Sequence, residues 1–92
     1  MEYNFEWDPE KAASNLKDHG VSFEEAITAF GDPFSMNMPD PDHSEGEQRF
    51  IVLGTTARLR PVVVSHTERP PRTRIIRARL ATRHERRQYE EQ

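Results

Sequence analysis

The chain has 92 residues, of which 34% are hydrophobic and 32% charged, and it contains no cysteine. We expect a single domain over residues 1–92, because separate cores rarely form in fewer than about 100 residues each. The lack of cysteine excludes a disulfide framework and a thiolate zinc site. No signal peptide and no apolar run of about 18 residues is visible, which predicts a cytoplasmic protein with no membrane segment.

Charge is divided unevenly between the two halves of the chain. Residues 1–48 carry two lysines and twelve carboxylates, a net charge of −10, whereas residues 49–92 carry eleven arginines and four carboxylates, a net charge of +7. Arginine binds phosphate through two parallel hydrogen bonds and stays charged at physiological pH. The distribution therefore indicates a polyanion-binding surface on an acidic body. The alternative is that the two halves neutralise each other across a solvated surface.

An edge strand and a helix are predicted at the N-terminus. Aromatic and polar residues alternate over residues 3–7, which is the period of a half-buried strand. Asp8 and Pro9 supply the cap and the first residue of a helix that runs to about His19. Gly20 then tolerates the left-handed conformation that ends such a helix.

A second helix and an acidic loop are predicted next. Ser22 and Glu25 match a capping box, in which the serine accepts an amide hydrogen bond and the glutamate reaches back, and the helix ends at Gly31-Asp32-Pro33. Residues 34–38 alternate and are expected to pair as a short strand. Residues 39–47 are rich in Asp, Pro, Ser and Glu, which predicts a mobile acidic loop.

The second half predicts an antiparallel meander followed by a helix. Three segments rich in β-branched residues, 49–56, 61–68 and 72–80, are separated by turn residues. A second capping-box pattern begins a helix over residues 83–89. The whole order of strand, two helices, meander and helix predicts an α+β domain. We expect the two helices to cover one face of the sheet and to leave the other face free.

Arginines occur on both faces of the last predicted strand. Alternation puts Arg72 and Arg74 on one face with Ile76 and Ala78, and it puts Arg77 and Arg79 on the other with Thr73 and Ile75. Two guanidinium groups two residues apart lie about 7 Å apart, which suits one phosphate or two neighbouring phosphates. The alternative is an edge strand that carries charge to prevent aggregation.

His66 and Glu68 are the candidate acid-base pair. They lie two residues apart in the middle strand of the meander, on one face with Val62 and Val64, and the following turn brings them beside the arginine strand. Histidine titrates near neutral pH, and a carboxylate can orient it and stabilise its cation. Such groups beside arginines suit RNA cleavage without a metal. A plain surface histidine is the alternative for His66.

No cofactor or metal is expected. Asp40, Asp42 and His43, with two further glutamates nearby, could be drawn as a metal site, but an acidic loop supplies oxygen atoms without a rigid spacing. His19 and His84 are accounted for by their places near helix ends. These three histidines are therefore not predicted to act in catalysis.

Spaced identities along nearly the whole chain match one known family. They comprise Phe5-Glu6-Trp7-Asp8-Pro9, Lys11-Ala12, Asn15, the segment 19–26, Phe30, Asp32-Pro33, Asp42-His43, Glu47, Arg49, Gly54, Thr67-Glu68-Arg69, Arg74-Ile75-Ile76, Ala78-Arg79, Ala81, Glu85-Arg86 and Tyr89-Glu90. On these residues the chain resembles the BrnT toxin family. Arg77 departs from the family pattern, in which a small serine is common at this position.

The resemblance implies a RelE-like fold and a ribonuclease toxin of a type II toxin-antitoxin system, which stops translation by cutting RNA. It also implies inhibition by a BrnA-like antitoxin with a ribbon-helix-helix segment, in a hetero-oligomer that binds promoter DNA only through the antitoxin. An alternative function is a non-catalytic module that binds nucleic acid or a partner.

The resemblance implies a metal-independent endoribonuclease. At the positions that match the family, Arg74 and Arg79 are expected to bind the phosphate and Glu68 to supply the catalytic carboxylate. His66 is added as a catalytic residue on its chemistry. RNA contacts are expected from further arginines of the basic half, namely Arg58, Arg60, Arg72 and Arg77.

Overall fold

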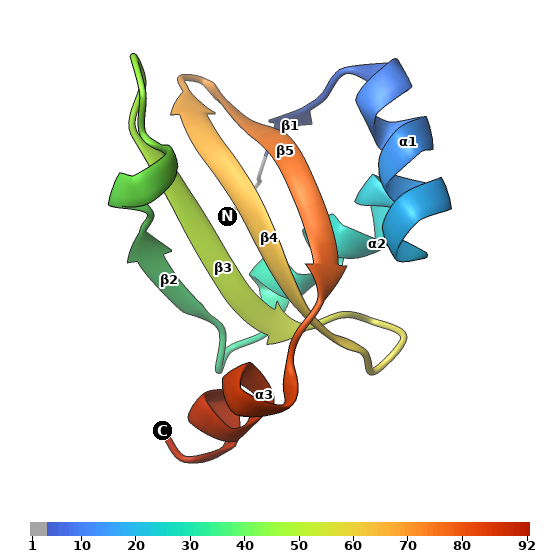
Figure 1. Cartoon of the computed structure of the whole chain (residues 1–92), viewed down its shortest axis with the longest axis vertical. Helices are drawn as coiled ribbons and strands as arrows, with labels where there is room; N and C mark the ends of the chain where they lie inside the picture. Colours follow the sequence, from blue (N-terminus) through green and yellow to red (C-terminus); the bar gives the residue numbers. More distant parts are fainter. Residues whose placement is uncertain (1–3) are drawn as a thin grey trace.

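A five-stranded mixed sheet with the order β1-β5-β4-β3-β2 forms the centre of the fold (Figure 1). The structure is a computed structural model and describes residues 4–92, so Tyr3 of the predicted first strand lies outside the described residues. β1 runs parallel to β5 at one edge, as predicted for an edge strand, and the other neighbouring strands are antiparallel. The strands are β1 (Phe5–Glu6), β2 (Met36–Pro39), β3 (Arg49–Thr55), β4 (Pro61–Arg69) and β5 (Arg72–Leu80).

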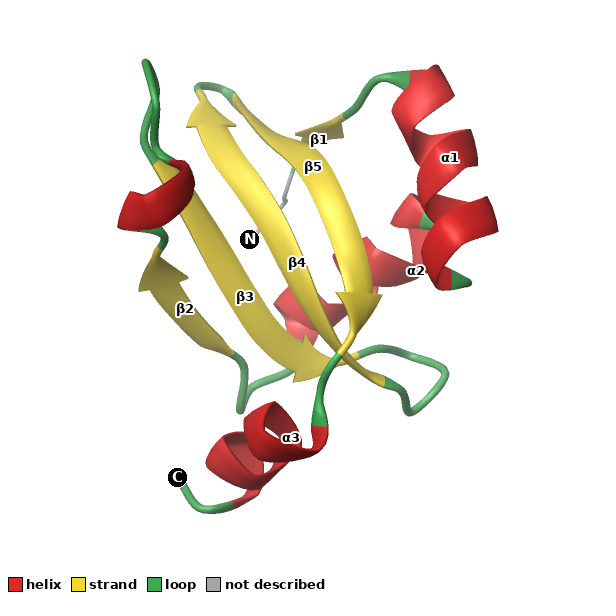
Figure 2. Ribbon diagram, viewed as in Figure 1, coloured by secondary structure: helices red, strands yellow, loops and turns green. Residues whose placement is uncertain are grey.

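The first two helices lie on the same face of this sheet (Figure 2). α1 packs on β5, and a 3₁₀ helix, η1, follows α2 directly and packs on β3. α3 lies beyond the end of the meander, and a second 3₁₀ helix, η2, lies in the acidic loop. The bounds are α1 (Pro9–His19), α2 (Phe23–Ala26), η1 (Ile27–Gly31), η2 (Pro41–His43) and α3 (Arg83–Glu90). The predicted α+β class and the two helices on one face are confirmed.

Local hydrogen bonds explain where the first helix begins and ends. At the start of α1, the Asp8 carboxylate accepts a hydrogen bond from the Glu10 amide at 2.9 Å. At its end, Gly20 adopts a left-handed conformation with φ 69°, which is unfavourable for residues that have a side chain. The predicted bounds of α1 are therefore confirmed at both ends. Within residues 4–92, no helix is long and apolar enough to cross a bilayer.

The second helix forms only half of its predicted capping box. Ser22 Oγ accepts the Glu25 amide at 3.0 Å, but the Glu25 carboxylate bonds to Thr56 and Arg60 instead of reaching back. The helix keeps α geometry for one turn and continues as 3₁₀ η1. Gly54 allows η1 to lie close to β3, since a Cβ there would be 3.0 Å from the Ala29 carbonyl oxygen.

A bulge in β5 changes the predicted faces of that strand. Ser65 pairs with Arg77 and His66 pairs with Ile75, so Ile76 is an extra residue on β5. Beyond it the alternation shifts by one residue, and Ala78 joins Ile75 in the buried core beneath the helices. The expectations that Ala78 shares a face with Arg74 and Ile76, and that Arg77 and Arg79 share one with Ile75, are therefore wrong.

The core lies between the helices and the sheet. Its members are aliphatic and aromatic side chains from α2, η1, β4 and β5, with Phe5 and Trp7 packed at its margin. Trp7 meets Phe23 edge-on, with ring centroids 5.8 Å apart, so the N-terminal strand contributes to the same core. The fully or almost fully buried members are Val21, Phe23, Ala26, Ala29, Val62, Val64, Ile75 and Ala78.

α3 is fastened to the rest of the fold by polar contacts. Thr82 and Glu85 form a complete capping box, as predicted. The Tyr89 hydroxyl donates to the Asp32 carboxylate, which also accepts the Thr55 amide at 2.8 Å. Asp32 therefore joins α3, β3 and the end of η1, while the other side of α3 remains exposed.

Candidate active site

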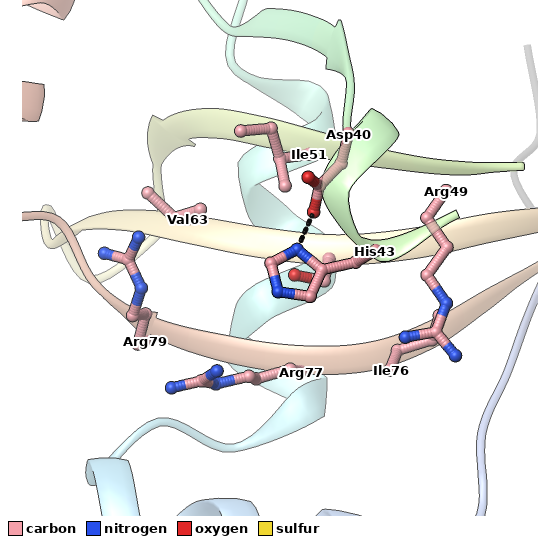
Figure 3. Close-up of a pocket in the computed structure, with 9 residues that line it drawn as sticks. Asp40, His43, Arg49, Ile51, Val63, Ile76, Arg77 and Arg79 are labelled. Carbon is pink, nitrogen blue, oxygen red and sulfur yellow. Dashed lines mark hydrogen bonds and ion pairs between the residues drawn. The ribbon is translucent and has the colours of Figure 1, made fainter. Parts of the chain in front are cut away.

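The face of the sheet opposite α1 and α2 holds a cavity of about 270 Å³ (Figure 3). The acidic loop, β3, β4 and β5 all contribute to its walls. Figure 3 shows the His43 ring in the middle of the view, with Arg49 on one side and Arg77 and Arg79 on the other. The lining residues are Asp40, His43, Arg49, Ile51, Val63, Ser65, Ile76, Arg77 and Arg79.

The acidic loop is tied to β3 at its base. The Asp40 amide donates to the Arg49 carbonyl at 2.8 Å, and the Arg49 amide donates to Ser44 Oγ at 2.9 Å. Ser44 Oγ in turn donates to the Asp40 carbonyl at 2.6 Å. η2 occupies the segment between Asp40 and Ser44, so the predicted acidic loop contains a hydrogen-bonded turn.

Within this turn, His43 and Asp40 form a hydrogen-bonded pair. His43 Nδ1 lies 3.0 Å from Asp40 Oδ2 and donates to it, because a carboxylate can only accept. The His43 side chain is 70% exposed and the Asp40 side chain 20%, so the carboxylate lies beneath the imidazole. Asp40 fixes the ring through Nδ1 and leaves Nε2 for a bound molecule, which is the arrangement of an oriented acid-base group.

Three arginines give the cavity a positive wall. Arg77 and Arg79 lie beyond the β5 bulge, and Arg49 begins β3 beside the loop. Arg79 donates to Glu85 from both terminal nitrogens, at 2.7 and 2.9 Å. No carboxylate among residues 4–92 pairs with Arg77 or Arg49, and the buried Arg49 Nε has no hydrogen-bond partner there. An anionic ligand fits such a wall better than a neutral one.

The predicted catalytic histidine lies elsewhere. His66 shares a face with Val62 and Val64, as expected, but this is the face that the helices cover, and the residue is 1% exposed. Its ring packs edge-on against Phe30 and stacks on Phe50. His66 lies beside the arginine strand β5, as expected, but on the opposite face from Arg77 and Arg79 of the cavity, because which face the helices cover is a tertiary property.

The environment of His66 favours the uncharged ring. Burial lowers the pKa of His66, and the charge of Glu68 opposes this shift without overcoming it. Nδ1 lies 3.3 Å from Glu68 Oε1, within ion-pair distance, but neither ring nitrogen makes a well-oriented hydrogen bond. Glu68 also accepts a hydrogen bond from Thr73 at 3.0 Å, so the pair lies at the margin of the core.

The other predicted arginines are only partly brought to the cavity. Arg79 and Arg77 line it, whereas Arg74 is paired with Glu6 at 2.6 Å outside it. Arg60 is held by Glu25 at 2.6 and 2.8 Å, and exposed Arg58 lies 3.8 Å from the same carboxylate. Arg72 is exposed and lines no part of the cavity.

Sequence reasoning missed Asp40, His43, Arg49 and Ser65 as cavity residues. The available signal was the spacing of Asp40 and His43, three residues apart with Pro41 between them, which suits one turn of helix with both side chains on one side. The acidic surroundings of His43 hid this signal, since they suggested a metal site without rigid spacing and not a histidine held by one carboxylate.

The fold and this site define a small α+β domain that carries an arginine-lined, histidine-containing cavity on the free face of its sheet. The model of the family described as the ribonuclease toxin BrnT of type II toxin-antitoxin systems matches residues 7–85. The chain therefore belongs to the BrnT family of ribonuclease toxins.

A solved structure supports the same fold. The crystal structure of the Brucella abortus ribonuclease toxin BrnT is similar to this chain with a TM-score of 0.69 and 18% sequence identity. The similarity covers 89% of this chain and 100% of that chain. No curated protein sequence matches the chain.

Proposed function

We propose that the toxin cuts RNA in the cavity on the free face of the sheet, with His43 as the acid-base group. The observation that carries this proposal is the 3.0 Å hydrogen bond from His43 to Asp40 inside a cavity that three arginines line. A general base must lie within reach of its substrate and be fixed in orientation. In support, His43 lines the cavity and is held by Asp40. Arg77 and Arg79 then bind the phosphate.

The chemistry needs no metal. His43 Nε2 accepts the proton of a ribose 2′-hydroxyl as the 2′-oxygen attacks the neighbouring phosphorus. The arginines neutralise the charge that develops on the pentavalent phosphorane. The bond from phosphorus to the 5′-oxygen breaks, the 5′-oxygen takes a proton from water, and a 2′,3′-cyclic phosphate remains. His43 finally returns its proton to solvent.

Cleavage of an RNA oligonucleotide in EDTA tests this proposal. The wild-type protein is expected to produce 2′,3′-cyclic phosphate ends. His43→Ala should slow cleavage by about 100-fold or more, and Arg79→Ala should do so by about 100-fold. His19→Ala changes a half-buried histidine at the end of α1, outside the cavity, and serves as the matched control. Cleavage by His43→Ala at the wild-type rate would reject the assignment of the site.

The type II toxin-antitoxin family implies an antitoxin partner. We infer that this partner is BrnA-like, with a ribbon-helix-helix segment, and that promoter DNA is bound only through the complex. Cutting of RNA in the cytoplasm would stop translation. Growth arrest on induction of the toxin, relieved by a co-expressed BrnA-like protein, is the expected outcome. Growth arrest should be lost in His43→Ala if RNA cleavage causes it.

A further inference from the structure

Glu85 of α3 holds the guanidinium group of Arg79. Glu85 Oε1 accepts from Arg79 Nη1 at 2.7 Å, and Oε2 accepts from Nη2 at 2.9 Å. Nη1 also donates to the Leu80 carbonyl at 3.3 Å. The terminal edge of the guanidinium group is therefore occupied, and both side chains are mostly covered, at 32% and 21% exposed.

The second edge of the same guanidinium group remains available. Arginine has five N–H donors in a fixed planar fork, and Nε–H with the outer hydrogen of Nη2 forms another parallel pair. Among residues 4–92, Arg79 Nε has no hydrogen-bond partner. Because the plane is rigid, a carboxylate on one edge fixes the direction of the other edge, which can bind two phosphate oxygens.

Glu85 is itself fixed by the start of α3. Its Oε1 accepts the Thr82 amide at 2.8 Å, and its own amide donates to Thr82 Oγ1 at 3.2 Å. The hydrogen bond from Arg79 lowers the pKa of Glu85 to about 2, so the carboxylate stays charged throughout the physiological range. The Thr82 backbone amide thus fixes the carboxylate that holds Arg79, without help from the Thr82 side chain.

We propose that Glu85 is a positioning residue that holds Arg79 with its Nε edge directed to the scissile phosphate. This inference rests on the proposed function of the cavity and names a residue outside the cavity lining. Glu85 contributes through Arg79 and does not touch the RNA. Glu85 places a negative charge near the site where the RNA polyanion would bind, and this charge weakens binding. A site built only for affinity would therefore not contain it.

The rival explanation is competition, in which Glu85 occupies Arg79 and phosphate must displace it. The two explanations differ in which kinetic constant responds. Loss of positioning lowers kcat, because misplaced groups in the transition state slow the chemical step by up to about 100-fold. Loss of a competing charge lowers KM and leaves kcat unchanged or higher.

The test compares Glu85→Gln with Thr82→Ala in the full chain. Glutamine still supplies the capping contact at this position but loses the ion pair, whereas Thr82→Ala removes the hydroxyl of the cap and keeps the contacts of Glu85 with Arg79. Glu85→Gln is expected to lower kcat by about 100-fold with KM unchanged or lower. Thr82→Ala should keep kcat within about twofold, since it leaves the pair intact. The double variant Arg79→Ala/Glu85→Gln should be no slower than Arg79→Ala.

Unchanged or increased kcat in Glu85→Gln would overturn the inference, as would an equal loss in Thr82→Ala. A second readout does not depend on cleavage: the Nη–Hη NMR signal of Arg79, assigned by its absence in Arg79→Ala. Because the Nη hydrogens donate to Glu85, this signal should be resolved and protected from exchange with water in the wild type and in Thr82→Ala, and broadened or lost in Glu85→Gln. If the wild type cuts no RNA, the proposed function fails while this signal still tests the positioning. An unchanged signal in Glu85→Gln refutes the positioning alone.

Discussion

The Asn15 side chain pairs with both backbone groups of Ala78 as a neighbouring strand would. Asn15 Nδ2 donates to the Ala78 carbonyl at 2.8 Å, and Asn15 Oδ1 accepts the Ala78 amide at 3.1 Å. Nδ2 also donates to the Val21 carbonyl at 2.9 Å. β1 pairs with the edge of β5 only at Thr73 and Arg74. Further along this edge, Asn15 makes the backbone hydrogen bonds that a neighbouring strand would make, and it thereby joins α1 to the sheet.

Asn15→Ala is expected to lower the free energy of unfolding by about 3 kcal/mol, because it removes three buried hydrogen bonds and leaves the Ala78 backbone unpaired. Urea unfolding followed by circular dichroism measures the change. Ser14→Ala, at an exposed neighbouring position of α1, is the control and should change stability by less than about 0.5 kcal/mol. Equal stabilities of the two variants would show that the pairing with Ala78 does not hold α1.

Arg60 and Arg58 contact the same carboxylate but should differ in their contributions to stability. Glu25 is 8% exposed, and the hydrogen bonds from Arg60 lower its pKa although burial opposes the shift. Arg60→Ala leaves this buried carboxylate with only the Thr56 hydroxyl and the more distant Arg58, which should cost about 3 kcal/mol at neutral pH. Arg58→Ala removes a contact at 3.8 Å from an exposed side chain and should cost less than about 0.5 kcal/mol.

The pH dependence of unfolding checks this assignment of Arg60. A carboxylate whose pKa is lowered by folding stabilises the fold above its unfolded pKa of about 4.5, and this contribution is lost as pH falls through the lower folded pKa. The difference between wild type and Arg60→Ala should therefore shrink below pH 4.5. A difference that stays constant down to pH 2 would contradict the ion pair as its source.

His66 should make the fold less stable in mild acid. Its folded pKa lies below the unfolded value of 6.5 because the ring is buried, so the unfolded chain binds more protons between these two values. Its contribution is complete above pH 6.5 and is lost as pH falls from 6.5 towards the folded pKa. His66→Leu should remove this loss, while near pH 8 its stability should stay within about 1 kcal/mol of wild type. Chemical unfolding of both proteins from pH 8 to pH 5 measures it, and parallel curves would refute the assignment.

Leu59 occupies a turn position that suits glycine. Its φ is 64°, a conformation that costs a residue with a side chain about 1–2 kcal/mol, and the side chain is 83% exposed. Leu59→Gly should raise the melting temperature and stabilise the fold by about 1 kcal/mol. This value is the strain that is relieved, less the larger conformational entropy that glycine loses on folding. Leu59→Ala keeps the strain and is the control. A loss of stability in Leu59→Gly would show that the exposed side chain makes a contribution of its own.

Local signals in the sequence predicted most of the fold. Asp8 and Gly20 fixed the ends of α1 because a cap depends on a few neighbouring residues. The same holds for Thr82 at α3 and for the three meander strands, whose turns separate runs of β-branched residues. Each of these features depends on contacts within one turn or one strand, which the order of residues reveals directly.

Features that depend on pairing between distant segments were not predicted. The bulge at Ile76 arises from the register of β4 against β5, and a strand that contains arginines on both predicted faces gives no local sign of it. The same shift directs Arg77 and Arg79 to the free face, while the covering helices bury His66. Asp40 and His43 were missed because their pairing depends on a turn fastened to β3.

The parallel pairing of β1 with β5 joins residues 68 positions apart, as between Glu6 and Arg74. During synthesis β1 leaves the ribosome long before the strand with which it pairs. The sheet cannot close until β5 has emerged, so the cavity is not assembled while only the acidic half of the toxin exists. RNA cleavage in the proposed site therefore has to wait until β5 has folded against the acidic half.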